Sequence, residues 1–169
     1  MTNNTDFEAI RINVHLFTGR MWDNIPLRQE LQKLPAEATL RQVWGVRYVY
    51  EINMVAALAY PVPDAEAEVI VAAKAAAAFL ATRAAARVLP LMGGDHPYAS
   101  RRATEAIMSA ALCARLLGSS DPTGRLEAAV SHAMRAVDAA NEAAYHGTGR
   151  QDWPHFRADL RTLLARPTV

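Results

Sequence analysis

The stretch that decides the fold runs from residue 65 to residue 89 and reads AEAEVIVAAKAAAAFLATRAAARVL. It holds twelve alanines, and alanine has the highest helix propensity of the common residues. Asp64 precedes the run as a candidate N-terminal cap, and Pro90 follows it. The run therefore predicts a long helix whose small side chains let a neighbouring helix approach closely.

Further helices are predicted on both sides of this run, because apolar residues recur at helical spacing between proline, glycine and capping residues. They are expected at residues 26–34, 39–60, 97–118 and 121–147, and from Asp152 to just before Pro167. Thr39 and Gln42 have the spacing of a capping box. Short loops between helices favour antiparallel neighbours, so we expect one all-α bundle of about five to seven helices. It would span residues 1–169, with 1–38 as an extension packed on it.

Each predicted helix carries an apolar stripe that we expect to be buried. In residues 39–60 the stripe consists of Val43, Val46, Tyr50, Met54 and Leu58. In residues 97–118 it consists of Ile107, Ala111, Ala114 and Leu117. In residues 121–147 it consists of Leu126, Val130, Ala133, Met134, Val137 and Ala140. In the last helix it consists of Phe156, Leu160, Leu163 and Leu164.

Residues 7–17 fit two patterns. Ile10, Ile12, Val14 and Leu16 alternate with polar residues, which is typical of a half-buried strand, whereas Phe7, Ile10, Val14 and Phe17 form a helical stripe. We favour a helix here, because no other segment shows a strand pattern that would supply a partner.

The composition is that of a folded globular protein, with 51% hydrophobic and 21% charged residues. The net charge is only +1, so no global field favours nucleic acid or anionic lipid. Residues 1–68 carry nine acidic and six basic residues, for a net charge of −3, and residues 69–169 carry eight acidic and twelve basic residues, for +4.

The single cysteine, Cys113, rules out an internal disulfide and fits a small core residue. The polar start lacks a signal peptide's apolar run, and residues 69–80 are too short and alanine-rich to span a bilayer, so we expect a cytoplasmic protein.

Residues 84–111 contain a more specific pattern. They read AAARVLPLM, then a loop with His96-Pro97, and then RRATEAI from Arg101 to Ile107. This phrase resembles the Ala-rich helical immunity proteins of bacterial polymorphic-toxin systems, in which a helix ends in a similar Val-Leu-Pro-Leu phrase before a short polar loop. Met92 stands where that family usually carries an acidic residue. The resemblance implies an all-α protein that binds and neutralises a toxin, and it implies no catalytic residues.

Four arginines are the candidate partner-binding residues. Arg83 and Arg87 lie four residues apart near the end of the Ala-rich helix, and Arg101 and Arg102 begin the next predicted helix. If the two helices are antiparallel, all four lie at one end of the bundle. The arginine fork suits carboxylates and phosphates, which favours an acidic partner. The competing interpretation is pairing within the chain, for example between Arg101 and Glu105.

A second candidate site is a metal site on residues 121–147. Asp138, Glu142 and His146 are spaced at i, i+4 and i+8, so they share one helix face and carry ligand types found in metal-binding bundles. His132 or His155 would have to add further ligands. The competing interpretation is a solvated face, with His146 favouring the negative end of its helix.

Three functional hypotheses remain open from the sequence. The leading one is a non-enzymatic protein-binding module that needs no cofactor, with an immunity protein as the particular case. The alternatives are a small helical metal-binding protein or metalloenzyme, and a homo-oligomeric helical scaffold, of which a homodimer is the simplest form. No phosphate-binding glycine loop, nucleophile elbow or basic-aromatic helix occurs, so we expect neither nucleotide chemistry nor nucleic-acid binding.

Overall fold

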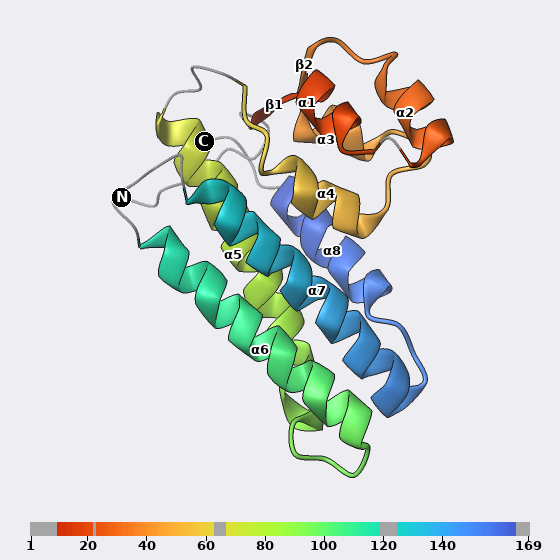
Figure 1. Ribbon diagram of the computed structural model, residues 1–169, viewed down its shortest axis with the longest axis vertical. Coiled ribbons are helices and arrows are strands. Elements are labelled where there is room, and N and C mark those ends of the chain that lie inside the picture. Colours follow the sequence, from red (N-terminus) through yellow and green to blue (C-terminus); the bar gives the residue numbers. More distant parts are fainter. Residues whose placement is uncertain (1–9, 22, 63–66, 119–124, 165–169) are drawn as a thin grey trace.

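The computed structural model describes residues 10–21, 23–62, 67–118 and 125–164. Three long helices pack against one another: α5 (Ala67–Val88), α6 (Pro97–Leu117) and α7 (Leu126–Thr148) (Figure 1). A 3-10 turn, η2 (Leu89–Leu91), ends α5, and α8 (Trp153–Leu164) lies against α5 and α4. The predicted all-α class is confirmed, since helices dominate the described residues.

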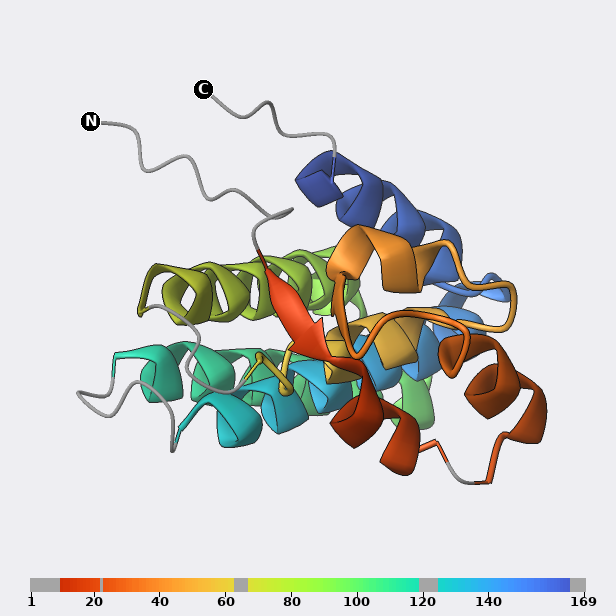
Figure 2. The same cartoon turned by 90° about the horizontal axis from the view of Figure 1, so that it is seen from above.

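The elements before α5 are short and sit at one end of the three long helices (Figures 1 and 2). They are, in chain order, β1 (Arg11–Asn13), α1 (Val14–Gly19), α2 (Ile25–Leu31), β2 (Glu37–Thr39), α3 (Leu40–Trp44) and α4 (Glu51–Ala57). Buried side chains from Ile10 to Leu164 form one hydrophobic cluster that joins these elements to the long helices. The bundle and its N-terminal part therefore share a core.

The preference for a helix over residues 7–17 was only partly right. Within the described part, residues 11–13 form β1, which pairs antiparallel with β2, and a helix begins only at Val14. Asn13 caps that helix, because its side chain accepts a hydrogen bond from the backbone N–H of Leu16 at 3.1 Å. The partner strand is only three residues long, too short for an alternating pattern to announce it in the sequence.

The predicted helix 39–60 is two helices, which raises the number of α-helices in the described residues to eight. The capping box of Thr39 and Gln42 is confirmed at the start of α3. Gly45 ends α3, and the β-branched and aromatic residues that follow have low helix propensity. Asn53 then accepts a hydrogen bond from the Tyr50 N–H at the start of α4. Tyr50 consequently lies exposed, although the unbroken pattern placed it in the core.

Helix α6 buries a different face from the predicted one. Its buried residues include Ala103, Ala106, Ala110 and Cys113, whereas Ala111 and Ala114 are exposed and Ile107 is half-buried. Small side chains on this face let α6 lie close to α5 and α7, and close packing outweighs the larger apolar area of Ile107 and Leu117. The predicted stripes of α7 and α8 are confirmed, except that Met134 is only half-buried.

Helix α5 has buried alanines along most of its length. The segment Ala67–Leu91 is long and apolar enough to cross a membrane by composition, with a mean hydropathy of 1.6 in its most apolar window. However, 56% of that window is buried inside the bundle, and the core helix of a soluble protein has the same features. The expected cap Asp64 lies outside the described residues, as does residue 121, at which a later helix was predicted to begin.

Candidate functional site

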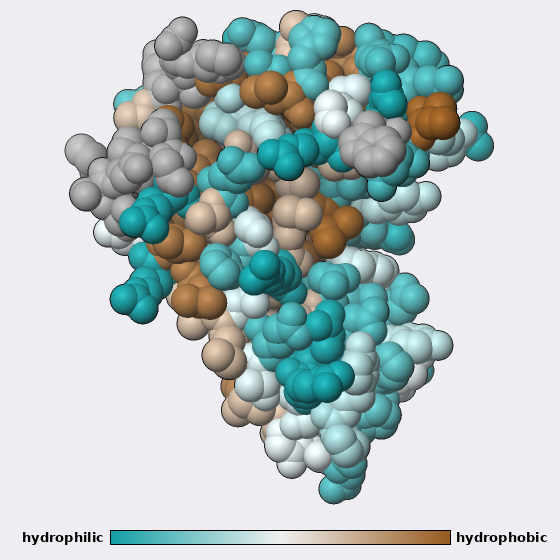
Figure 3. Space-filling model, viewed as in Figure 1, coloured by the Kyte–Doolittle hydropathy of each residue, from teal (hydrophilic) through white to brown (hydrophobic). Residues whose placement is uncertain are grey.

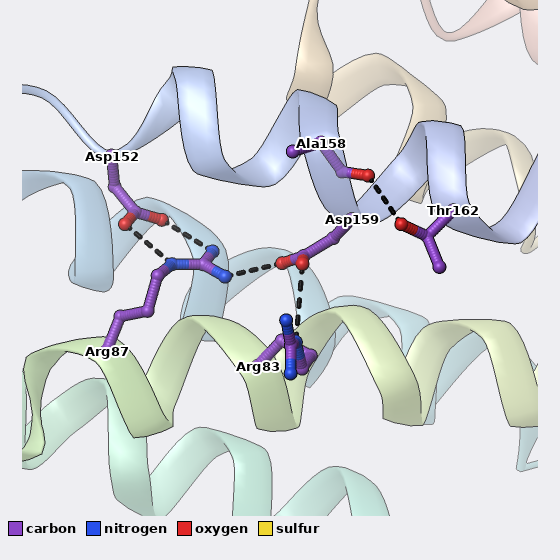
Figure 4. A network of polar contacts seen from close by, with 6 residues as sticks. All are labelled: Arg83, Arg87, Asp152, Ala158, Asp159 and Thr162. Atoms are coloured by element: carbon purple, nitrogen blue, oxygen red, sulfur yellow. Dashed lines mark hydrogen bonds and ion pairs between the residues drawn. The ribbon is translucent and has the colours of Figure 1, made fainter.

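A buried ionic network joins α5 to the start of α8 (Figure 4). Arg87 donates two hydrogen bonds of 2.8 Å to the carboxylate of Asp152 and a third to Asp159. Arg83 also donates to Asp159, at 3.3 Å, but its side chain is 60% exposed. Asp152 and Asp159 are both buried. Because each carboxylate has an arginine partner, the network provides the charge compensation that buried carboxylates require.

The position of Asp152 explains why α8 is held at this place. Asp152 immediately precedes the helix, and its backbone N–H donates a 2.8 Å hydrogen bond to the side chain of Asn141 on α7. Arg87 is half-buried, which by itself lowers its pKa, but the hydrogen bonds to Asp152 and Asp159 outweigh burial and raise the pKa above its usual value. Arg87 is therefore a charged structural link between α5 and α8, and Asp152 extends this link to α7.

The other two predicted arginines have different surroundings. Arg102 pairs with Glu105 on its own helix and with Asp138 on α7, at 3.4 Å. Arg101 is exposed, and its guanidinium lies over the ring of Tyr98, 5.1 Å from the ring centre. The four arginines thus have different partners: Arg83 and Arg87 bind α8, Arg102 links α6 to α7, and Arg101 faces solvent.

The row Asp138, Glu142 and His146 does share one side of α7, but its members have separate partners. Asp138 pairs with Arg102, and Glu142 accepts a hydrogen bond from Tyr98 and lies 3.5 Å from His146. The ring of His146 packs edge-on against Tyr98. Within the described ranges, no three His, Cys, Asp or Glu side chains are grouped closely enough to hold a metal ion. The row is therefore better explained by pairing within the protein.

A surface hollow of about 450 Å³ lies along α6 and α7. Its lining consists of Arg101, Thr104, Glu105, Met108, Ser109, Leu112 and Arg135. Met108 and Leu112 are exposed large hydrophobic side chains, at 61% and 40%. Arg135 is exposed, and neither it nor Arg101 forms an ion pair with any carboxylate of the described residues. We call these seven residues the α6–α7 hollow.

The sequence interpretation found only Arg101 of this hollow. The predicted buried stripe of α6 ran through Ile107 and Ala111. Met108 and Leu112, which lie beside that stripe, were therefore not predicted to be functional. One signal was present: Met108 and Leu112 are four residues apart and share a face with Arg101 and Arg115. Large apolar residues on an arginine-bearing helix face indicate a surface that is not simply solvated.

A second hollow, of about 600 Å³, lies between the N-terminal elements and α8. Its lining includes Arg20, Tyr50, Glu51, Trp153 and Arg157. The buried Glu51 pairs with Arg157, and Arg20 pairs with Glu127 at 3.4 Å. Both cations of this hollow, Arg20 and Arg157, already have carboxylate partners. The hollow therefore offers less to an acidic ligand than the α6–α7 hollow does.

Cys113 is a small core residue, as the sequence predicted. Burial raises the pKa of its thiol to about 11, so the reactive thiolate is scarce near neutral pH. We expect the folded protein to resist a thiol reagent at about pH 8 and the urea-unfolded chain to react fully. Equal labelling rates for the folded and unfolded protein would contradict a buried thiol.

The raised pKa of the Cys113 thiol also makes the stability of the folded protein depend on pH. The thiol of the folded protein has a higher pKa than its ordinary value of 9.0, so folding favours the protonated form. The resulting contribution to stability is present below pH 9.0 and is lost as the pH rises towards about 11. A Cys113→Ala variant should lose less stability over that interval than the wild type.

Comparisons with known proteins found no match to this chain. No protein-family model matches the chain, and no curated protein or solved structure matches it. The class of the protein is defined by the structure alone, as an all-α bundle with a short two-stranded sheet.

Proposed function

We propose that this chain is a non-enzymatic protein-binding module whose contact surface is the α6–α7 hollow. The observation that carries the proposal is the exposed pair Met108 and Leu112, bordered by the unpaired cations Arg101 and Arg135. An apolar centre with a charged rim is the arrangement typical of protein interfaces, in which arginine and methionine are enriched.

The proposed interface contains different residues from the four predicted arginines. Arg83, Arg87 and Arg102 bind carboxylates within the chain, so only Arg101 remains from the predicted set. Arg135, Met108 and Leu112 join it. The resemblance of residues 84–111 to immunity proteins implies a toxin as the partner, and this identity remains a proposal. A cytoplasmic location is likewise an expectation from the sequence.

Affinity capture with matched variants tests the proposed surface. The immobilised wild-type protein is expected to retain a stoichiometric partner from a lysate of its own source. Met108→Glu should lose that partner, since a charge would be buried at the centre of the interface. Ile25→Glu is the matched control, because Ile25 on α2 and Met108 are both 61% exposed.

The opposite pattern would refute the assignment of the surface. If Ile25→Glu loses the partner and Met108→Glu keeps it, the α6–α7 hollow is not the interface. Circular dichroism and urea unfolding of both variants check that neither change has altered the fold. Both positions are exposed, so we expect changes in unfolding free energy within about 0.5 kcal/mol.

A homo-oligomeric scaffold is the second candidate, and one feature of α5 favours it. Val71, near the start of α5, and Leu89, in the 3-10 turn that ends it, are both more than half exposed. Ala75 and Ala86, which lie between them, are also exposed. Such a row allows close helix packing between copies. A monomer in light scattering at high protein concentration would remove this candidate.

A further inference from the structure

We propose that the α6–α7 hollow takes an amphipathic helix of a partner protein, apolar along one stripe and acidic on its flanks. This inference rests on the proposed function and specifies the chemistry of the partner. It is drawn from the spacing of the side chains along α6 and from the charges that remain unpaired around the hollow.

The spacing of the lining residues favours a helical occupant. Arg101, Glu105, Met108 and Leu112 follow one another at intervals of four, three and four residues. This alternation keeps side chains on one seam of a helix and is the spacing that coiled-coil partners use. Met108 and Leu112 are thus about one turn apart, as are the i and i+4 residues of a helix that packs on them.

The hollow is bordered by two helices. Its lining comes from α6, except for Arg135, which α7 contributes. The two helices are antiparallel and in extensive contact, since Arg102 meets Asp138 and Tyr98 meets Glu142 (Figure 1). A third helix laid along them would extend the bundle by the same packing that holds α5, α6 and α7 together.

The charges favour an acidic partner over a second copy of this chain. Arg102 occupies both nearby carboxylates, Glu105 and Asp138. Arg101 and Arg135 therefore face solvent without an acidic partner from the described part of the chain. A second copy of the same surface would bring its own Arg101 and Arg135 into the interface, whereas carboxylates on a partner helix would neutralise these charges.

A pair of synthetic helices tests this chemistry. The first peptide, of about 18 residues or five turns, carries leucines at alternating three- and four-residue spacing and glutamates on both flanks. The second has lysine in place of every glutamate. Fluorescence anisotropy of each labelled peptide measures its affinity for the full-length protein at low ionic strength, where charge effects are largest. We expect the glutamate peptide to bind at least about tenfold more tightly than the lysine peptide.

Charge reversal in the protein identifies the surface that binds. The double variant Arg101→Glu, Arg135→Glu should bind the glutamate peptide about tenfold or more weakly than the wild type does. It should bind the lysine peptide more tightly. Arg47→Glu is the matched control for Arg101, because Arg47 also lies over a tyrosine ring, at 5.4 Å from the centre of Tyr48. It should leave both affinities unchanged.

Three results would overturn the inference. They are equal affinity for the two peptides, no binding of the glutamate peptide, or a homodimer in light scattering that Met108→Glu dissociates. The last result would assign the surface to a second copy. If the glutamate peptide fails while Met108→Glu still abolishes capture of the retained protein, the proposed binding function stands and only the acidic helix is wrong.

Discussion

Replacing Arg87 with alanine is expected to lower the free energy of unfolding by about 3–5 kcal/mol, because it removes one partner of a buried ion pair. The carboxylate of Asp152 would lose both of its 2.8 Å hydrogen bonds from Arg87. Asp159 would keep only Arg83, which is 60% exposed. Urea unfolding followed by circular dichroism measures the loss.

Two further variants separate charge compensation from packing. Arg83→Ala should cost less than about 1 kcal/mol, because an ion pair with an exposed partner contributes little. Asp152→Asn in the Arg87→Ala background should recover part of the loss, since it removes the uncompensated charge. Equal destabilisation by Arg83→Ala and Arg87→Ala would contradict the claim that burial makes the ion pairs of Arg87 contribute more to the unfolding free energy.

Replacing Phe156 with alanine is expected to lower the free energy of unfolding by a similar amount, about 3–5 kcal/mol. The side chain is fully buried on α8, and its ring packs edge-on against Trp153 at 6.1 Å. The loss combines the transfer of an aromatic ring to water with the cavity that remains. Because α8 carries both Phe156 and Asp159, the apolar and ionic contacts hold the same helix.

The control for Phe156 lies six residues further along the same helix. Thr162 is exposed, and its hydroxyl only donates to the backbone oxygen of Ala158 (Figure 4). Thr162→Ala should therefore change the unfolding free energy by no more than about 0.5 kcal/mol. A Phe156→Ala variant that unfolds at the wild-type urea concentration would mean that α8 does not pack as described.

The long helices were predictable because local signals and packing agree there. The alanines of α5, the apolar seam of α7 and the last helix with Phe156 all form their elements in the expected places. Cys113 was also placed correctly in the core. In each case the residues that favour the helix also fill its buried face, so the periodicity of the sequence carries the answer.

Features that depend on distant residues were not predictable. β1 exists because residues 37–39 lie beside it, and the break before α4 depends on a cap supplied by Asn53. On α6, alanines displaced Ile107 from the buried face because the neighbouring helices lie close. Periodicity reports the amount of apolar side chain on each face and not the distance to the next helix.

The candidate site was predictable only in its residue type. Arginine was expected to mark the partner surface, but the acidic partners Asp152 and Asp159 of Arg83 and Arg87 lie more than sixty residues away in the chain. The face of the molecule seen in Figure 3 has mixed polarity, with hydrophobic residues gathered towards the end with the N-terminal elements. Which arginines remain free is decided by tertiary pairing.

The most direct test of the central claim is methionine-methyl NMR of the protein with and without its retained partner. The chain has six methionines, of which Met108 lines the hollow, Met54 is buried in the core and Met92 is exposed after η2. We predict that the methyl signal of Met108 shifts most on binding and that those of Met54 and Met92 stay in place. A shift of Met92 with an unmoved Met108 would contradict the α6–α7 hollow as the partner surface.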